Sequence, residues 1–173
     1  FNARDEMISQ ISPIVNNYYN ILSDNKEEVS ILYKSELYKN SLADLFQKNI
    51  EKDRALGFTT SGVHRDDMIY HMNGQSFKYF ASQGQQKSFL VALKLAQYQL
   101  ISERLGVKPI MLLDDLFDKL DINRVKNLIK IVSSQDFGQV FITDSNKLRV
   151  SDIFLNLNCE FKSYEFSNGS LSI

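Results

Sequence analysis

The chain has 173 residues, of which 43% are hydrophobic and 24% are charged, and its formal net charge is −1. This composition is typical of a soluble globular protein with one sizeable domain or two small ones. No apolar run approaches the roughly 20 residues of a membrane span, and the single Cys159 excludes an internal disulfide. Because the net charge is near zero, the chain does not have the basic surface expected of a free-standing nucleic-acid binder. Because the first residue is Phe1 and no signal peptide pattern follows it, we expect a cytoplasmic segment of a longer protein.

The first third of the chain predicts a helix, a strand and a second helix. Apolar residues recur every three or four positions over Asn2–Leu22, which is the period of an amphipathic helix. Residues 29–37 are rich in β-branched and aromatic side chains and predict a strand. Ser41 followed by Asp44 resembles a capping box, so a second helix begins there, and Gly57 ends it.

A hairpin signal then leads into a cluster of polar residues. The sequence MIYHMNGQSFKYF has alternating runs on both sides of Asn73-Gly74, which is the strongest short-range signal for a hairpin. The sequence SQGQQKS follows and places a glycine among uncharged hydrogen-bonding side chains, directly before a helical pattern that ends near Gly106. One Ser, Thr, Asp or Asn is enough to cap a helix. The surplus of donors therefore predicts that an anion binds at this helix start.

Two continuously apolar segments farther along are typical of buried parallel strands. They are PIMLL from Pro109 and QVFIT from Gln139. A helical pattern capped by Asp121 lies between them and is long enough for a crossover, so the segments predict a βαβ unit. The tail over 152–173 contains a second Asn-Gly turn at 168–169 and is expected to add edge strands.

Acidic and hydroxyl side chains follow both apolar strands. Asp114 and Asp115 end the first strand, and Thr143, Asp144 and Ser145 end the second. Ligands of open α/β sheets bind outside the carboxyl ends of the strands, and Mg²⁺ takes one or two carboxylates together with waters and phosphates. A solvated acidic turn is the alternative, but the buried strand and the polar cluster upstream favour a metal site.

Four ordered segments resemble motifs of the ABC-type ATPases. SQGQQ, IMLLDD, LFDKLD and QVFITDS correspond to the signature motif, Walker B, D-loop and switch strand. With HRDD and the Asn-Gly hairpin ahead of the signature, the chain closely resembles the RecF family of bacterial recombinational repair proteins. The resemblance implies an α/β fold. Residues 61–173 would form the C-terminal part of the ATPase head, a parallel sheet with flanking helices, and residues 1–60 part of a helical second lobe.

The resemblance also assigns roles to single residues. Those matching the family's Ser-Gly-Gly-Gln signature would face the γ-phosphate of ATP bound to another subunit; they are Ser82, Gln83, Gly84 and Gln85, with Gln83 where many members have glycine. Asp121 matches the D-loop aspartate, which places it at the nucleotide.

The remaining assignments fall on the two strand ends. Asp114 matches the Walker B aspartate that steadies Mg²⁺, and Asp115 stands where other members have a catalytic glutamate. Asp115 is therefore the expected catalytic residue, which orients the attacking water. No histidine follows the switch strand, so Thr143 or Asp144 would sense the γ-phosphate.

No G-x-x-x-x-G-K-[ST] motif occurs in the chain, so the loop that cradles the phosphates is expected upstream, and the chain is expected to be inactive by itself. The resemblance implies that the intact protein uses ATP and Mg²⁺ and forms an ATP-dependent homodimer. It would bind duplex DNA at gapped junctions and work with RecR-like and RecA-like proteins. No membrane partner is expected.

Two other functions stay open. An SMC- or Rad50-like head would tether DNA, but it would need a long coiled coil, and the chain has no sustained heptads. A non-catalytic interaction module would merely keep the fold.

The loop over His64–Asp67 could hold a metal or transfer protons, although a structural loop is favoured because only one histidine is near.

Overall fold

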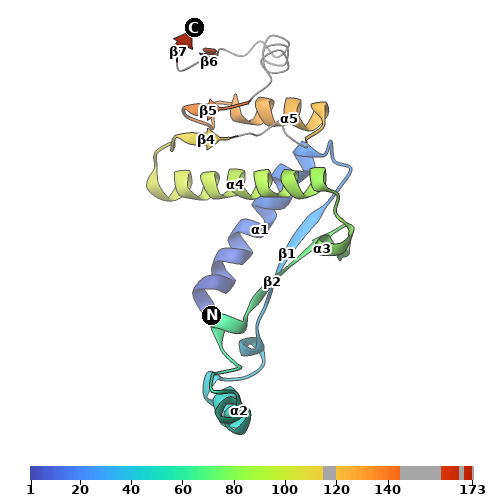
Figure 1. Cartoon of the computed structure of the whole chain (residues 1–173), viewed down its shortest axis with the longest axis vertical. Helices are drawn as coiled ribbons and strands as arrows, with labels where there is room; N and C mark the ends of the chain where they lie inside the picture. Colours follow the sequence, from blue (N-terminus) through green and yellow to red (C-terminus); the bar gives the residue numbers. More distant parts are fainter. Residues whose placement is uncertain (115–119, 145–160, 168–169, 173) are drawn as a thin grey trace. The chain divides into compact units, whose positions relative to one another are not determined.

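The structure of the protein is a computed structural model that describes residues 1–114, 120–144, 161–167 and 170–172 (Figure 1). The chain divides into two compact units, Phe1–Leu100 and Ile101–Ile173. This division differs from the lobe boundary expected at residue 60, and the assignment of residues 1–60 and 61–173 to two lobes stays a prediction.

The first unit contains a three-stranded antiparallel sheet in the order β1-β2-β3. Its strands are β1 (Val29–Lys34), β2 (Asp67–Met72) and β3 (Gln75–Ser76). Asn73 and Gly74 join β2 to β3 with positive φ angles of 49° and 78°, as a tight hairpin turn requires. The hairpin predicted at this dipeptide is confirmed.

Two predicted strands are shorter than the sequence indicates. β1 ends at Lys34 because Ser35 caps a 3-10 turn, η1 (Glu36–Tyr38), accepting a hydrogen bond from the Leu37 N–H at 3.1 Å. After Ser76 the chain forms the short helix α3 (Phe77–Phe80) instead of continuing the hairpin strand. The buried Phe77 ring packs 4.8 Å from the Phe89 ring, so tertiary packing overrides the alternating pattern.

Helix α1 (Asn2–Leu22) lies beside β1 (Figure 1). One stripe of the helix is buried, comprising Ile11, Val15, Tyr19 and Leu22, as the predicted amphipathic period requires. Polar side chains of the same helix bind the strand, since Asn16 Oδ1 accepts from the Val29 N–H at 2.9 Å. The helix predicted over these residues is confirmed.

Two further helices complete the first unit. α2 (Leu42–Leu56) begins at Ser41, whose hydroxyl accepts from the Asp44 N–H at 3.1 Å, and ends at Gly57 with φ of 74°. A second 3-10 turn, η2 (Val63–Arg65), precedes β2. α4 (Gln83–Leu105) buries an apolar face around Phe89, Ala92 and Leu95, and it runs past the division between the units.

The second unit contains the predicted βαβ segment. β4 (Met111–Leu113) and β5 (Val140–Ile142) pair in parallel, and α5 (Ile122–Val132) connects them. Leu112 and Phe141 are register partners and are 73% and 49% exposed, so one face of this strand pair is apolar and uncovered among the described residues.

The tail forms a separate antiparallel pair, β6 (Glu165–Ser167) and β7 (Ser170–Ser172). This pairing agrees with the predicted hairpin, whose turn at 168–169 lies outside the described residues, as does Cys159. In the described part of the chain, no helix combines the length and hydropathy that crossing a bilayer would require.

Candidate functional site

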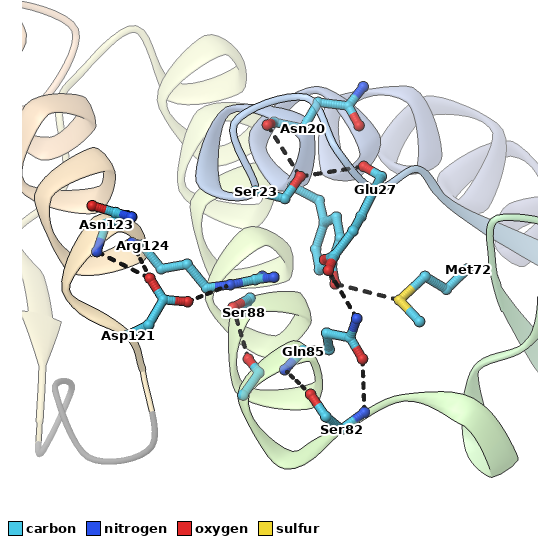
Figure 2. A network of polar contacts seen from close by, with 12 residues as sticks. Asn20, Ser23, Glu27, Met72, Ser82, Gln85, Ser88, Asp121, Asn123 and Arg124 are labelled. Carbon is cyan, nitrogen blue, oxygen red and sulfur yellow. Dashed lines mark hydrogen bonds and ion pairs between the residues drawn. The ribbon is translucent and has the colours of Figure 1, made fainter.

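The polar cluster at the start of α4 forms a capping box (Figure 2). The Ser82 N–H donates to Gln85 Oε1 at 2.8 Å, and the Gln85 N–H donates to Ser82 Oγ at 3.3 Å. This reciprocal pair is the Ser-x-x-Gln capping box. Gln86 Nε2 donates to the Ala81 carbonyl at 3.0 Å. Two of the glutamines therefore complete the helix start, which accounts for part of the donor surplus without any ligand.

Several hydrogen-bond donors of the cluster remain available to a ligand. Within the described part of the chain, the N–H groups of Gln83 and Gly84 have no hydrogen-bond partner. Ser82 is exposed, and its hydroxyl accepts the bond from Gln85, so its own hydrogen is free to be donated. A helix N-terminus carries partial positive charge. These groups suit an anionic oxygen such as one of a phosphate.

A second layer of contacts holds Gln85 in place (Figure 2). Gln85 Nε2 donates to Glu27 Oε1 at 2.8 Å, and the Tyr19 hydroxyl donates to Glu27 Oε2, also at 2.8 Å. Tyr19 is fully buried, and its hydroxyl also lies 3.6 Å from Met72 Sδ. Sequence reasoning missed Glu27, because a glutamate in a polar turn before a strand gives no signal of a partner 58 positions away.

In the second unit, Asp114 and Thr143 lie together at the carboxyl ends of β4 and β5. The parallel register places Leu113 beside Ile142, and the Thr143 N–H donates to the Leu113 carbonyl at 3.0 Å. The Thr143 hydroxyl donates to Asp114 Oδ1. The structure thus brings Asp114 and Thr143 into contact, as their positions after neighbouring parallel strands predicted, while their assignment to Walker B and the switch strand stays a prediction.

This donor set fits Mg²⁺ held mainly through phosphates. Asp114 is an exposed carboxylate, and Mg²⁺ commonly takes one or two carboxylates with waters and substrate oxygens. Over the described ranges, no group of three or more His, Cys, Asp or Glu side chains could hold a metal without a substrate. Asp144 follows Thr143 in the chain and is half-buried. The predicted catalytic residue Asp115 and the hydroxyl of Ser145 lie outside the described residues.

Asp121 caps α5. Its Oδ1 accepts from the N–H groups of Asn123 and Arg124, both at 3.0 Å, and its Oδ2 lies 3.1 Å from Arg124 Nε (Figure 2). The Arg124 side chain is only 12% exposed. The cap predicted at Asp121 is confirmed, and its assignment as a nucleotide-binding D-loop residue stays a prediction.

The loop before β2 makes local structural contacts. His64 Nε2 lies 3.1 Å from the Thr59 carbonyl oxygen, and the Arg65 guanidinium lies 5.6 Å from the Phe58 ring centroid. Asp66 accepts a hydrogen bond from the Tyr33 hydroxyl, and burial, followed by this bond, raises the pKa of Tyr33. These contacts favour the structural interpretation of the loop.

Solved structures with a similar fold define the class of protein. The recombination mediator protein RecF-ATPrS in the RecFOR pathway matches with a TM-score of 0.68 and 22% identity, over 98% of this chain and 45% of that one. A structure on ATP-driven dimerization and DNA-stimulated activation of SMC ATPases matches with a TM-score of 0.59 and 12% identity, over 99% and 86%. Identities this low show the fold alone. The chain has the mixed α/β fold of part of a RecF or SMC ATPase head, as the resemblance implied.

Curated relatives narrow the class to one family. The DNA replication and repair protein RecF of Flavobacterium johnsoniae is 43% identical over 164 residues, which cover 95% of this chain and 46% of that protein. RecF of Parabacteroides distasonis is 39% identical over 171 residues, covering 99% and 47%. The chain belongs to the RecF family and spans about half the length of these relatives, in their C-terminal portion. No protein-family model matches the sequence.

Proposed function

We propose that the chain is the C-terminal part of an ATP-dependent DNA-binding protein of recombinational repair and replication restart. The observation that carries this proposal is the 43% identity to a RecF protein over 95% of the chain. The intact protein would be an ATPase that dimerises on ATP, binds DNA at gaps and, with RecR-like and RecA-like proteins, helps to load recombinase. Since that DNA is chromosomal, we place the protein in the cytoplasm.

The start of α4 supports a role in binding the γ-phosphate of ATP held by the partner subunit. The Ser82 hydroxyl and the N–H groups of Gln83 and Gly84 donate no hydrogen bond to any described residue. The helix dipole adds positive potential at the same place. Gln85 would contribute indirectly, because its side chain is engaged by Ser82 and Glu27. Such donors stabilise the charge that develops on a transferring phosphoryl group.

The ends of β4 and β5 support a role at the metal and the attacking water. Asp114 would hold Mg²⁺, and the ion would supply positive charge that offsets the charge of the phosphates. Thr143, which donates to Asp114, would orient that carboxylate, and Asp144 beside it would respond to the γ-phosphate. Asp115 directly follows Asp114 and is our candidate for orienting the water.

The uncovered face of β4 and β5 supports the assignment of residues 61–173 to part of an ATPase core. Leu112 and Phe141 form an exposed apolar pair on strands that a complete parallel sheet would cover on both faces. Residues 1–60 would belong to the helical lobe. The chain has no phosphate-cradling loop of its own, so we expect that it does not hydrolyse ATP by itself.

The test is Ser82→Arg in the intact protein. The arginine side chain would fill the space for the γ-phosphate, so ATP-induced dimerisation in light scattering should disappear while calorimetry shows unchanged ATP binding to the monomer. Ser134→Arg adds the same cation at another exposed serine and should leave the dimer intact. An ATP-induced dimer that persists in Ser82→Arg would refute the assignment.

Two carboxylate variants test the hydrolytic site. Asp115→Asn should lower single-turnover hydrolysis by roughly 10²- to 10⁴-fold, the usual contribution of a general base, while Mg-ATP still binds. Asp114→Asn should instead weaken Mg²⁺-dependent ATP binding. Hydrolysis at the parental rate in Asp115→Asn would move the catalytic role to Asp144.

DNA binding by the intact protein tests the alternative function. If its DNA affinity were equal with and without ATP, the non-catalytic interaction module would be favoured.

A further inference from the structure

One carboxylate, that of Glu27, ties the start of α4 to the rest of the first unit. Both polar ends of the Gln85 amide are engaged, since Oε1 accepts from the Ser82 N–H and Nε2 donates to Glu27 Oε1, each at 2.8 Å (Figure 2). An amide turned by 180° would place its NH₂ group against the Ser82 N–H, donor facing donor. Glu27 accepts only from the NH₂ group, and it therefore selects the orientation that completes the cap.

Glu27 is itself fixed on several sides. Its Oε2 accepts from the hydroxyl of Tyr19, whose side chain is fully buried, at 2.8 Å. Its backbone carbonyl accepts from the hydroxyl of the buried Ser23 at 3.3 Å. Glu27 lies in the turn between α1 and β1, so its carboxylate is anchored to the packed core of the unit. The acceptor that meets Gln85 is thus held by rigid elements and is charged, which strengthens the bond.

We infer that Glu27 is a positioning residue for the signature segment. Through Gln85 it satisfies the Ser82 N–H and holds the first turn of α4, which leaves the Ser82 hydroxyl hydrogen and the N–H groups of Gln83 and Gly84 free for a phosphate oxygen. Glu27 acts on the nucleotide only through Gln85. The inference rests on the proposed function of Ser82 in the ATP-dependent dimer.

The experiment compares Glu27→Ala and Glu27→Gln in the intact protein, with Ser82→Arg alongside. Glu27→Ala removes the acceptor of Gln85, so ATP-dependent dimerisation should weaken about tenfold or more, the usual effect of losing a hydrogen bond to a charged group. ATP affinity of the monomer should not change. Glu28→Ala is the matched control, because this exposed neighbour contacts Asn73 through its backbone, and it should dimerise like the parent.

Glu27→Gln should restore dimerisation. Its carbonyl oxygen can accept from Gln85, and its NH₂ group can donate to the Tyr19 oxygen while the Tyr19 hydroxyl turns to Met72 Sδ, which already lies 3.6 Å away. Each of these three contacts then has a donor and an acceptor. A residue that served only through its negative charge would not be rescued by this amide.

The outcomes separate this inference from the proposed function. If Ser82→Arg still dimerised on ATP, the proposed function would be wrong. If Ser82→Arg abolished the dimer and Glu27→Ala left it unchanged, or if Glu27→Gln were as weak as Glu27→Ala, the positioning role would be wrong. Should Glu27→Ala fail to fold, Gln85→Met decides, because it removes both amide contacts and leaves the Glu27–Tyr19 pair intact. Parental dimerisation of Gln85→Met would overturn the inference.

Discussion

Replacing Asp121 with Ala should destabilise α5 by about 1–2 kcal/mol. The carboxylate caps two N–H groups at 3.0 Å and lies 3.1 Å from Arg124 Nε. Loss of an N-cap typically costs about 1 kcal/mol. The ion pair adds less than about 1 kcal/mol, because the Asp121 side chain is 59% exposed and solvent screens it. Asp121→Asn keeps an equally good capping oxygen and loses only the ion pair, so it should cost under about 1 kcal/mol.

Amide hydrogen exchange of α5 in the intact protein measures these differences directly. Since about 1.4 kcal/mol corresponds to a factor of ten, the amides near Asn123 should exchange roughly tenfold faster in Asp121→Ala and within about fivefold of the parent in Asp121→Asn. Equal damage by both variants would refute the capping argument. Loss of ATP-dependent dimerisation in Asp121→Asn, with α5 still protected, would give the carboxylate the separate role that its resemblance to a D-loop aspartate implies.

Three further predictions concern the first unit. Leu95→Ala should lower the free energy of unfolding by about 2–5 kcal/mol in urea denaturation, because this side chain is fully buried. Leu90→Ala is the control at a 50% exposed position of the same helix, and it should cost less than about 1 kcal/mol. The Tyr38 hydroxyl donates to Asp5, which raises the pKa of Tyr38 to about 12, so its absorbance at about 295 nm should titrate near there and not near 10 as in a free tyrosine. The stabilisation from this bond should be full below about pH 10 and lost as the pH rises through about 12; Asp5→Asn should return the midpoint toward about 10, and an unchanged midpoint would contradict the assignment. Gly57→Ala should cost about 1 kcal/mol in thermal unfolding, because φ is +74° there, a conformation that strains a residue with a Cβ. No atom of the described residues lies within 4 Å of the added carbon, so the cost comes from the backbone alone, and a neutral result would mean that the backbone relaxes there.

Signals that act over a few residues were readable from the sequence. Ser41 and Asp121 begin helices where a capping residue precedes an apolar period, and Gly57 ends one by taking a positive φ angle. Asn73-Gly74 turns the hairpin for the same reason. In each case one residue's side chain or backbone freedom acts on neighbours no more than four positions away, and these neighbours are fixed by the sequence itself.

The order of the motifs also indicated the family. The segments that contain Ser82, Asp114 and Thr143 follow one another as the resemblance to the ABC-type ATPases expects, and the identity to RecF proteins agrees with that resemblance. The contact between Asp114 and Thr143 followed as well, because parallel strands bring their carboxyl ends to one edge of a sheet.

The tertiary structure decided what depends on distant partners. Phe77 leaves the predicted strand because its ring packs on Phe89, which no local pattern contains. From the sequence, Gln85 was expected to be one of the surplus donors available to a ligand. In the structure its amide is hydrogen-bonded to Ser82 and to Glu27, which is 58 positions away. A polar side chain shows in the sequence only what it can bind, whereas the packing of α1, β1 and α4 determines which partner comes within 3 Å and which donors are left for a ligand.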